Sequence, residues 1–258
     1  MTEAVDVFDD PLLASVYDDL DPWAASDEFY LGLAREIGGA VLDLGCGTGR
    51  LACRIAAEGC DVVGADPAGG MLGVARSRPG TEAVAWVQSD GQSLRLARRF
   101  DLIVMTGHAF QALLSDADAR AVLATAAHHL KRDGQFVFET RNPAKRAWLS
   151  WTPDQTREVV QTPAQGRVEA FYDAAAETGA EADTGIVGIA QHCRFLDLSL
   201  DGGPERIGRS RIRFIERDHL AGLLARAGLV AGAWYGDWHR GPFLPTSKEI
   251  IAVTRRAG

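Results

Sequence analysis

The chain has 258 residues, of which 47% are hydrophobic and 24% charged, and its formal net charge is −8. This length and composition suit one folded domain, or one domain with an insertion. The acidic balance provides no basic surface for a polyanion, so a nucleic-acid partner is not expected. No apolar run is long enough to cross a bilayer, and segment 1–10 lacks the basic and apolar regions of a signal peptide, which favours a cytoplasmic location. The four cysteines do not show metal-ligand spacing, so no metal site is expected.

Aromatic residues are spread among acids and alanines in segment 8–37, where Tyr17, Trp23, Phe29 and Tyr30 occur. The pattern predicts two short helices before the first strand of the main domain. These aromatics either pack the helices onto the core or contact a ligand, and the pattern alone does not separate the two interpretations.

A glycine-rich turn follows a short apolar strand at 41–44, and we expect a helix to begin at Thr48 or Gly49. A nicotinamide-dinucleotide fingerprint would place its third glycine one position later, where Arg50 stands. Asp43 lies inside the end of the strand, where a phosphate site would place no acid. The turn therefore predicts a site for a cationic ligand.

Two more strands are predicted at 60–65 and 83–88, and each is followed by an acid. Asp66 lies about twenty residues beyond the first glycine, the spacing at which a carboxylate receives the hydroxyls of an adenosine ribose. Alternatively, Asp66 is a helix N-cap with Pro67 at the first helical position. Asp90 precedes Gly91 and, taken alone, is an ordinary turn residue. With Asp43, the pattern places one carboxylate at the end of each of three successive strands.

The fourth strand, 100–105, leads into a loop that carries Thr106 and His108. In a doubly wound sheet such a loop faces the ligand. An imidazole there is able to accept a proton from an oxygen or nitrogen nucleophile near neutral pH. The simpler interpretation, which we favour, is that His108 only packs against or hydrogen-bonds the ligand.

The rest of the chain completes the fold. A helix at 116–130 and a fifth strand at 135–139 precede β-type runs at 167–172, 185–200 and 209–215, which predict an inserted antiparallel sheet. A helix at 216–227 and strands at 229–234 and 248–254 follow, and the two last strands should pair antiparallel. The loop between them carries Tyr235, Asp237, Trp238 and His239, which either line an acceptor pocket or pack against the insertion.

The glycine turn with Asp43, and Asp66-Pro67 followed by a helix containing Met71, resemble the first two motifs of class I S-adenosylmethionine-dependent methyltransferases of the small-molecule type. The resemblance implies an α/β fold: a doubly wound, Rossmann-like, mostly parallel seven-stranded sheet with an antiparallel last strand. It implies three parts, namely an N-terminal helical cap (1–37), a cofactor-binding domain (38–150 and 216–258) and an inserted β subdomain (151–215) over the acceptor pocket or in a homodimer contact.

The resemblance also implies that the methyl group of S-adenosylmethionine passes to a small molecule by in-line displacement. A tyrosine of the cap, Tyr17 or Tyr30, would lie near the methionine end of the cofactor. Asp90 would accept a hydrogen bond from the adenine amino group, and the backbone beside it would contact the edge of the ring. The expected cofactor-binding residues are Tyr17, Asp43, Gly45, Cys46, Gly47, Asp66, Pro67, Met71, Asp90, Gly91, Thr106 and His108, and His108 is also the candidate catalytic residue. The alternatives are a non-catalytic partner that only binds the cofactor and, with less support, a nicotinamide-dependent oxidoreductase.

Overall fold

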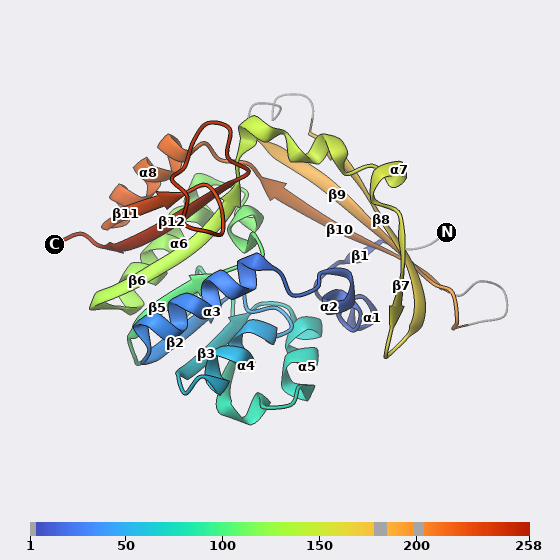
Figure 1. Ribbon diagram of the computed structural model, residues 1–258, viewed down its shortest axis with the longest axis horizontal. Helices are drawn as coiled ribbons and strands as arrows, with labels where there is room; N and C mark the ends of the chain where they lie inside the picture. The colour runs from blue at the N-terminus through green and yellow to red at the C-terminus, as the bar shows by residue number, and fades with distance from the viewer. Residues whose placement is uncertain (1–3, 178–184, 199–203) are drawn as a thin grey trace.

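The computed structural model describes residues 4–177, 185–198 and 204–258. Figure 1 shows two sheets, and the larger has the strand order β11-β12-β6-β5-β2-β3-β4. Its strands are β2 (Ala40–Leu44), β3 (Asp61–Asp66), β4 (Val84–Gln88), β5 (Phe100–Met105), β6 (Leu130–Arg141), β11 (Leu229–Tyr235) and β12 (Glu249–Arg256). The strands from β6 to β4 are parallel, while β12 is antiparallel to both β6 and β11. This arrangement confirms the predicted sheet with its antiparallel last strand.

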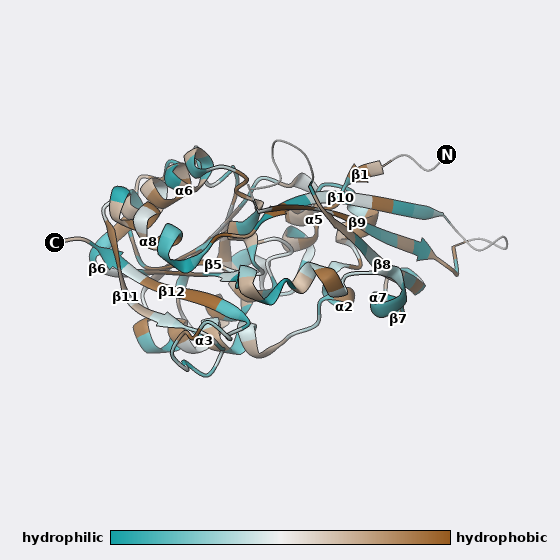
Figure 2. Cartoon of the chain, turned by 90° about the horizontal axis from the view of Figure 1, so that it is seen from above, coloured by the Kyte–Doolittle hydropathy of each residue, from teal (hydrophilic) through white to brown (hydrophobic). Residues whose placement is uncertain are grey.

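Helices cover both faces of this sheet, as the view from above shows (Figure 2). On one face α3 (Ala25–Ile37) and α4 (Arg50–Ala57) pack against β2 and β5. On the other face α6 (Asp116–His129) and α8 (Arg217–Arg226) pack against β5 and β6. Helix α5 (Gly69–Ser77) packs against Trp86 near the β4 edge. Strands buried on both faces explain the continuous apolar runs in the sequence.

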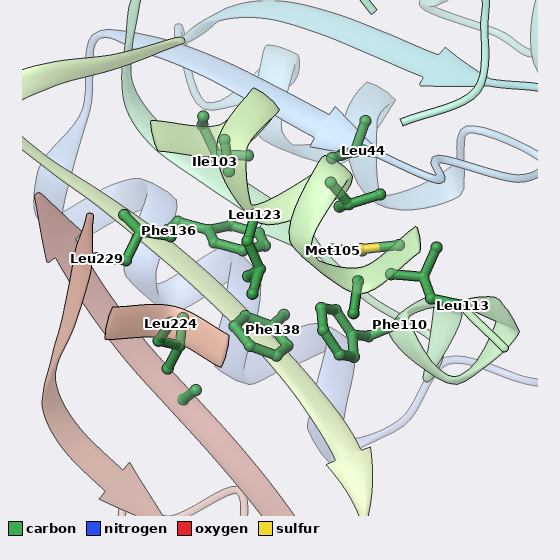
Figure 3. Packing of buried hydrophobic residues seen from close by; sticks show 14 of the residues in the cluster. Leu44, Ile103, Met105, Phe110, Leu113, Leu123, Phe136, Phe138, Leu224 and Leu229 are labelled. Atoms are coloured by element: carbon green, nitrogen blue, oxygen red, sulfur yellow. The ribbon is translucent and has the colours of Figure 1, made fainter. Parts of the chain in front are cut away.

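The core between the sheet and α6 and α8 fixes the carboxyl ends of the strands. Phe136 and Phe138 of β6 are fully buried, and Figure 3 shows them beside Leu123 of α6 and Leu224 of α8. Phe110, which follows β5, stacks on Phe138 with ring centroids 4.5 Å apart. Such dense packing holds the loops after β5 and β6 in place, because shifts there would open voids in the core.

The second sheet has the order β1-β10-β9-β8-β7. Its strands are β1 (Ala4–Asp6), β7 (Glu158–Thr162), β8 (Gly166–Ala176), β9 (Ile186–Phe195) and β10 (Glu205–Arg213). Strands β7 to β10 pair antiparallel, which confirms the predicted inserted sheet, and β1 is added parallel to β10. Strands β1 and β7 were not predicted. The end of the run expected at 185–200 and most of its flanking turns fall on residues 178–184 and 199–203, outside the described part of the chain.

The expectation of two helices in segment 8–37 was wrong in number. Three are present, because α1 (Pro11–Ala14) and α2 (Tyr17–Leu20) precede α3. Figure 1 shows α1 and α2 between the two sheets. Leu13 and Val16 from this segment pack against Val168 and Phe195 on the inner face of the smaller sheet. The N-terminal segment therefore joins the two sheets.

The remaining helical turns are short: α7 (Pro153–Thr156), η1 (Thr81–Ala83), η2 (Ala109–Ala112), η3 (Pro143–Lys145) and η4 (Ala147–Ser150). Among the residues that the structure describes, no helix combines the length and apolar composition needed to span a bilayer.

Candidate cofactor and acceptor sites

The glycine turn joins β2 to α4, and the N–H groups of Gly45, Cys46, Gly47 and Gly49 donate hydrogen bonds within the protein. The amides of Gly45 and Cys46 donate to the Ala65 carbonyl over 2.7 and 3.1 Å, and the amide of Gly47 donates to Asp66 Oδ2 over 2.8 Å. The turn is therefore able to offer carbonyl oxygens to a ligand, and these suit a cation. A pyrophosphate would need the N–H groups, so the geometry disfavours the dinucleotide alternative.

Asp43 lies beneath this turn and is 1% exposed. Neither carboxylate oxygen has a hydrogen-bond partner within the described residues. Burial, with smaller contributions from the nearby charges of Asp66, Asp27 and Glu139, raises the pKa of Asp43 to about 7. A buried acid without a partner is costly unless a cation or donor reaches it, so Asp43 fits the ammonium or sulfonium of the expected cofactor.

Asp66 ends β3, and both of its oxygens accept backbone bonds, Oδ2 from Gly47 and Oδ1 from Ala68 over 2.9 Å. Burial raises its pKa, and these two bonds oppose the shift. The N-cap alternative was wrong in detail, because α5 begins at Gly69 with Ala68 as its cap, and Pro67 lies before the helix. Each carboxylate oxygen keeps a second lone pair, so Asp66 is still able to accept ribose hydroxyls, and that role stays a prediction.

Asp90 follows β4 and is exposed. Its Oδ1 accepts from the amides of Gln92 and Ser93 over 2.9 and 2.7 Å, and its Oδ2 accepts from the Ser93 hydroxyl, which lowers the pKa of Asp90. This is the ordinary turn geometry that the sequence also allowed. The adenine contact proposed for Asp90 and Gly91 stays a prediction.

The N-terminal segment covers the glycine turn and the segment that follows β3. Tyr17 packs on a small buried cluster that contains Met71 and Ala68. The next residue, Asp18, accepts a hydrogen bond from Thr48 Oγ1 over 2.7 Å and forms an ion pair with Arg78. Helix α2 thus lies against both the glycine turn and the segment after β3.

A chamber of about 240 Å³ lies between the N-terminal helices, the carboxyl ends of β5 and β6, and the smaller sheet. Its lining consists of Tyr17, Leu20, Asp21, Ser26, Gly107, His108, Glu139, Arg141, Tyr172 and Gln191. The chamber brings His108 and Tyr17 together, as expected for residues near the methionine end of the cofactor. Burial raises the pKa of Tyr172 to about 12, so its hydroxyl is protonated over the working pH range.

Two residues weighed as ligand contacts pack into the core instead. Tyr30 is fully buried, and its hydroxyl donates a short hydrogen bond to Glu139 Oε2. Trp238, in the loop before β12, packs against Phe29 and Tyr30 with ring centroids 5.8 and 6.1 Å away. The packing interpretation holds for Trp238, although its partner is helix α3 and not the insertion.

Several polar residues of the chamber were not predicted. Glu139 and Arg141 end β6, where the rule that ligands lie at the carboxyl ends of parallel strands would have found them. Arg141 donates through Nη1 to Gln111 Oε1 over 3.0 Å, and its guanidinium lies over the Trp151 ring at 5.0 Å. Tyr172 and Gln191 come from the smaller sheet, where no local sequence signal marks which strand residues face the chamber.

Residues 41–134 match the family model described as a methyltransferase domain. The match covers the glycine turn and strands β3 to β5, and together with the strand order it supports the expected class I S-adenosylmethionine-dependent methyltransferase.

Among curated proteins, the chain is 27% identical over 222 residues to a glycine/sarcosine N-methyltransferase of Parasynechococcus marenigrum (strain WH8102), covering 84% of this chain and 72% of that protein. Among solved structures, it resembles the CcbJ methyltransferase from Streptomyces caelestis (TM-score 0.74, 21% identity, 98% of this chain and 99% of that one). It also resembles the sugar N-methyltransferase KedS8 from Streptoalloteichus sp ATCC 53650 (TM-score 0.72, 18% identity, 99% and 96%). The two structural matches support the fold.

Proposed function

We propose that this enzyme transfers the methyl group to an amine nitrogen of a small polar molecule held in the chamber. The observation that carries the proposal is the polar lining. Asp21 and Glu139 line the chamber with His108, and Arg141 contributes the positive charge. This balance favours an acceptor that carries an ammonium group beside hydroxyl or anionic groups.

The size of the chamber supports the same class of acceptor. A volume of about 240 Å³ fits a small metabolite and excludes a folded macromolecule. The names of two relatives agree, because the glycine/sarcosine enzyme and KedS8 are both N-methyltransferases. Arg141 would contact an anionic or hydroxyl group of the acceptor, and Tyr172 would donate a hydrogen bond to it.

The residues around the methyl donor would act by binding and alignment. Carbonyls of the glycine turn and Asp43 would hold the methionine part, and Asp66 the ribose. Tyr17 and α2 would keep water from the sulfonium. The donor is already activated, so holding nucleophile, methyl carbon and sulfur in line can supply about 7–11 kcal/mol of the barrier.

The test is incubation with methyl-labelled S-adenosylmethionine and a panel of amino acids, amino sugars and their hydroxyl analogues. We expect label on nitrogen, with one S-adenosylhomocysteine formed per methyl transferred. Label on oxygen or carbon would overturn the nitrogen assignment. Tight cofactor binding with no transfer to any compound of the panel or to a cell extract would favour the non-catalytic alternative.

A substitution at Tyr172 tests whether the acceptor binds in the chamber. Tyr172→Phe removes one neutral hydrogen bond and should raise KM for the acceptor about fivefold, corresponding to about 1 kcal/mol. Cofactor affinity should not change, because Tyr172 lies on the smaller sheet. A variant with weaker cofactor binding and an unchanged KM would place the acceptor elsewhere.

A further inference from the structure

His108 is held at its backbone and at its ring. Its backbone amide donates to Glu139 Oε1 over 2.7 Å, and its ring Nε2 lies 2.9 Å from Glu249 Oε2. Glu249 opens β12, the antiparallel strand, 141 positions later in the chain. The side chains of His108 and Glu249 are only 17% and 15% exposed, so solvent weakens their contact little.

The backbone of His108 is itself unusual. Its φ is +58°, a left-handed conformation that costs a residue with a side chain free energy. The bond to Glu139 offsets that cost, and Glu139 is in turn fixed by the Tyr30 hydroxyl on its other oxygen. Buried groups at both ends therefore place the ring.

The contact with Glu249 also selects the form of the neutral ring. A carboxylate only accepts hydrogen bonds, so Nε2 carries the proton and Nδ1 keeps its lone pair. His108 lines the chamber, and no partner for Nδ1 occurs among the described residues. The other titratable side chains that line the chamber are Tyr17 and Asp21 from the N-terminal segment, Glu139 and Arg141 from β6, and Tyr172 from β8.

We propose that Glu249 is a positioning residue that makes His108 the general base of the reaction. The proposal rests on the function proposed above. His108 Nδ1 takes one proton from the acceptor ammonium, and the imidazolium formed is stabilised by Glu249. The freed nitrogen lone pair then attacks the methyl carbon. The N–C bond forms as the C–S bond breaks, the bonding pair stays on sulfur as S-adenosylhomocysteine, and the methylated amine carries the positive charge.

The first measurement does not need the acceptor. In enzyme labelled with ¹⁵N-histidine and saturated with S-adenosylmethionine, the His108 nitrogen shifts should show a proton on Nε2 in the neutral ring. Glu249→Gln should give a mixture of tautomers, because a side-chain amide is able to accept or donate. A proton on Nδ1 in the wild type, or no change in the variant, would overturn the role of Glu249.

The second measurement is kinetic, with the amine that the labelling experiment identifies. Glu249→Gln should lower kcat about 10- to 100-fold, less than the roughly 10²- to 10⁴-fold that a whole general base contributes, because His108 itself stays in place. It should also displace the acidic limb of the pH profile of kcat/KM. KM for the amine and the cofactor dissociation constant should stay within about twofold. Glu249→Asp should recover part of kcat, and Glu82→Gln, an exposed carboxylate on η1, is the control.

A negative result for the proposed function and a negative result for the general base can be told apart. Methylation of oxygen or carbon only would overturn the proposed function, whereas the tautomer depends on the position of Glu249 alone. An unchanged kcat and pH profile in Glu249→Gln, with the amine still methylated, would overturn the base and leave the proposed function standing.

Discussion

Asp43 is a charge that the cofactor-free protein accommodates poorly. Its carboxyl has an ordinary pKa of 3.8, which burial raises to about 7 in the folded chain. An acid with a raised pKa binds more protons in the folded state than in the unfolded state between these values. The contribution of this group to the free energy of unfolding is therefore complete below about pH 4. As the pH rises to about 7, the free energy of unfolding declines by ~4 kcal/mol because of this group.

The prediction concerns Asp43→Asn, which removes this titration. Between about pH 4 and pH 7, the free energy of unfolding of the cofactor-free wild type should fall relative to that of the variant. Urea denaturation at a series of pH values measures this difference. S-adenosylmethionine affinity should rise over the same interval in the wild type only, because its cationic end binds the ionised acid. Equal pH dependence in both proteins would remove Asp43 from the site.

At the scale of residues, the spacing in the sequence placed three acids at strand ends. In the structure Asp43 and Asp66 lie in β2 and at the end of β3, beside the glycine turn, and their contact with the cofactor stays a prediction. Asp90 shows the limit of prediction from sequence, because an acid that only stabilises a turn and an acid that binds a ligand have the same local sequence pattern. Glu249 was not predicted, because its contact with His108 depends on the pairing of β12 with β6, which brings Glu249 beside Arg141.

At the scale of elements, the glycine turn is constrained by what packs on it. Gly49 has a φ of +73°, and a Cβ there would lie 2.4 Å from Trp86 and 2.9 Å from Ala75. Gly59, at the end of α4, has a φ of +89° with nothing within 4 Å. Both glycines therefore have a left-handed backbone conformation, but only Gly49 has neighbouring atoms that an added Cβ would meet.

Gly49→Ala should therefore lower the free energy of unfolding by about 3 kcal/mol, from backbone strain plus overpacking. Gly59→Ala should cost about 1 kcal/mol, because only the strain applies. Thermal or urea unfolding of both variants measures the difference. Equal losses would mean that Trp86 moves aside without cost.

Helix α2 is tied to the glycine turn through Asp18, which contacts Thr48 and Arg78. Asp18→Asn weakens the charged part of this link by about 1 kcal/mol, so the cofactor should dissociate about five times faster in stopped-flow measurements. Asp19→Asn, on the same helix, is the control. Identical dissociation rates in the two variants would show that α2 does not hold the cofactor in place.

Element prediction succeeded where periodicity was strong and failed where elements were short. The β5 bounds match the expected 100–105, and α6 matches to within one residue. Strand β1 has three residues and no alternation to detect, and it is ordered by pairing with β10, two hundred residues away. Strand β7 follows a short helix, and its exposed Val159 gives it no clear apolar face.

At the scale of the molecule, the chamber lies between the two sheets, and the N-terminal segment contacts both parts of the protein. Strand β1 extends the smaller sheet, while Asp9 Oδ1 accepts a hydrogen bond from the amide of Gly70 in α5 over 3.2 Å. The fold class followed from the alternation of strands and helices, whereas the relation between the sheets did not, because it depends on contacts between distant segments. The three-part division and the homodimer stay predictions.

The double attachment of residues 4–21 has a kinetic consequence. If the segment must move for the methyl donor to enter, and its return completes the wall of the chamber, then the donor has to bind before the acceptor. The enzyme should follow compulsory-order kinetics, with S-adenosylhomocysteine competitive against the donor and noncompetitive against the amine. Initial-rate inhibition patterns will show whether that sequence holds, and random addition would mean that the entrance stays open throughout turnover.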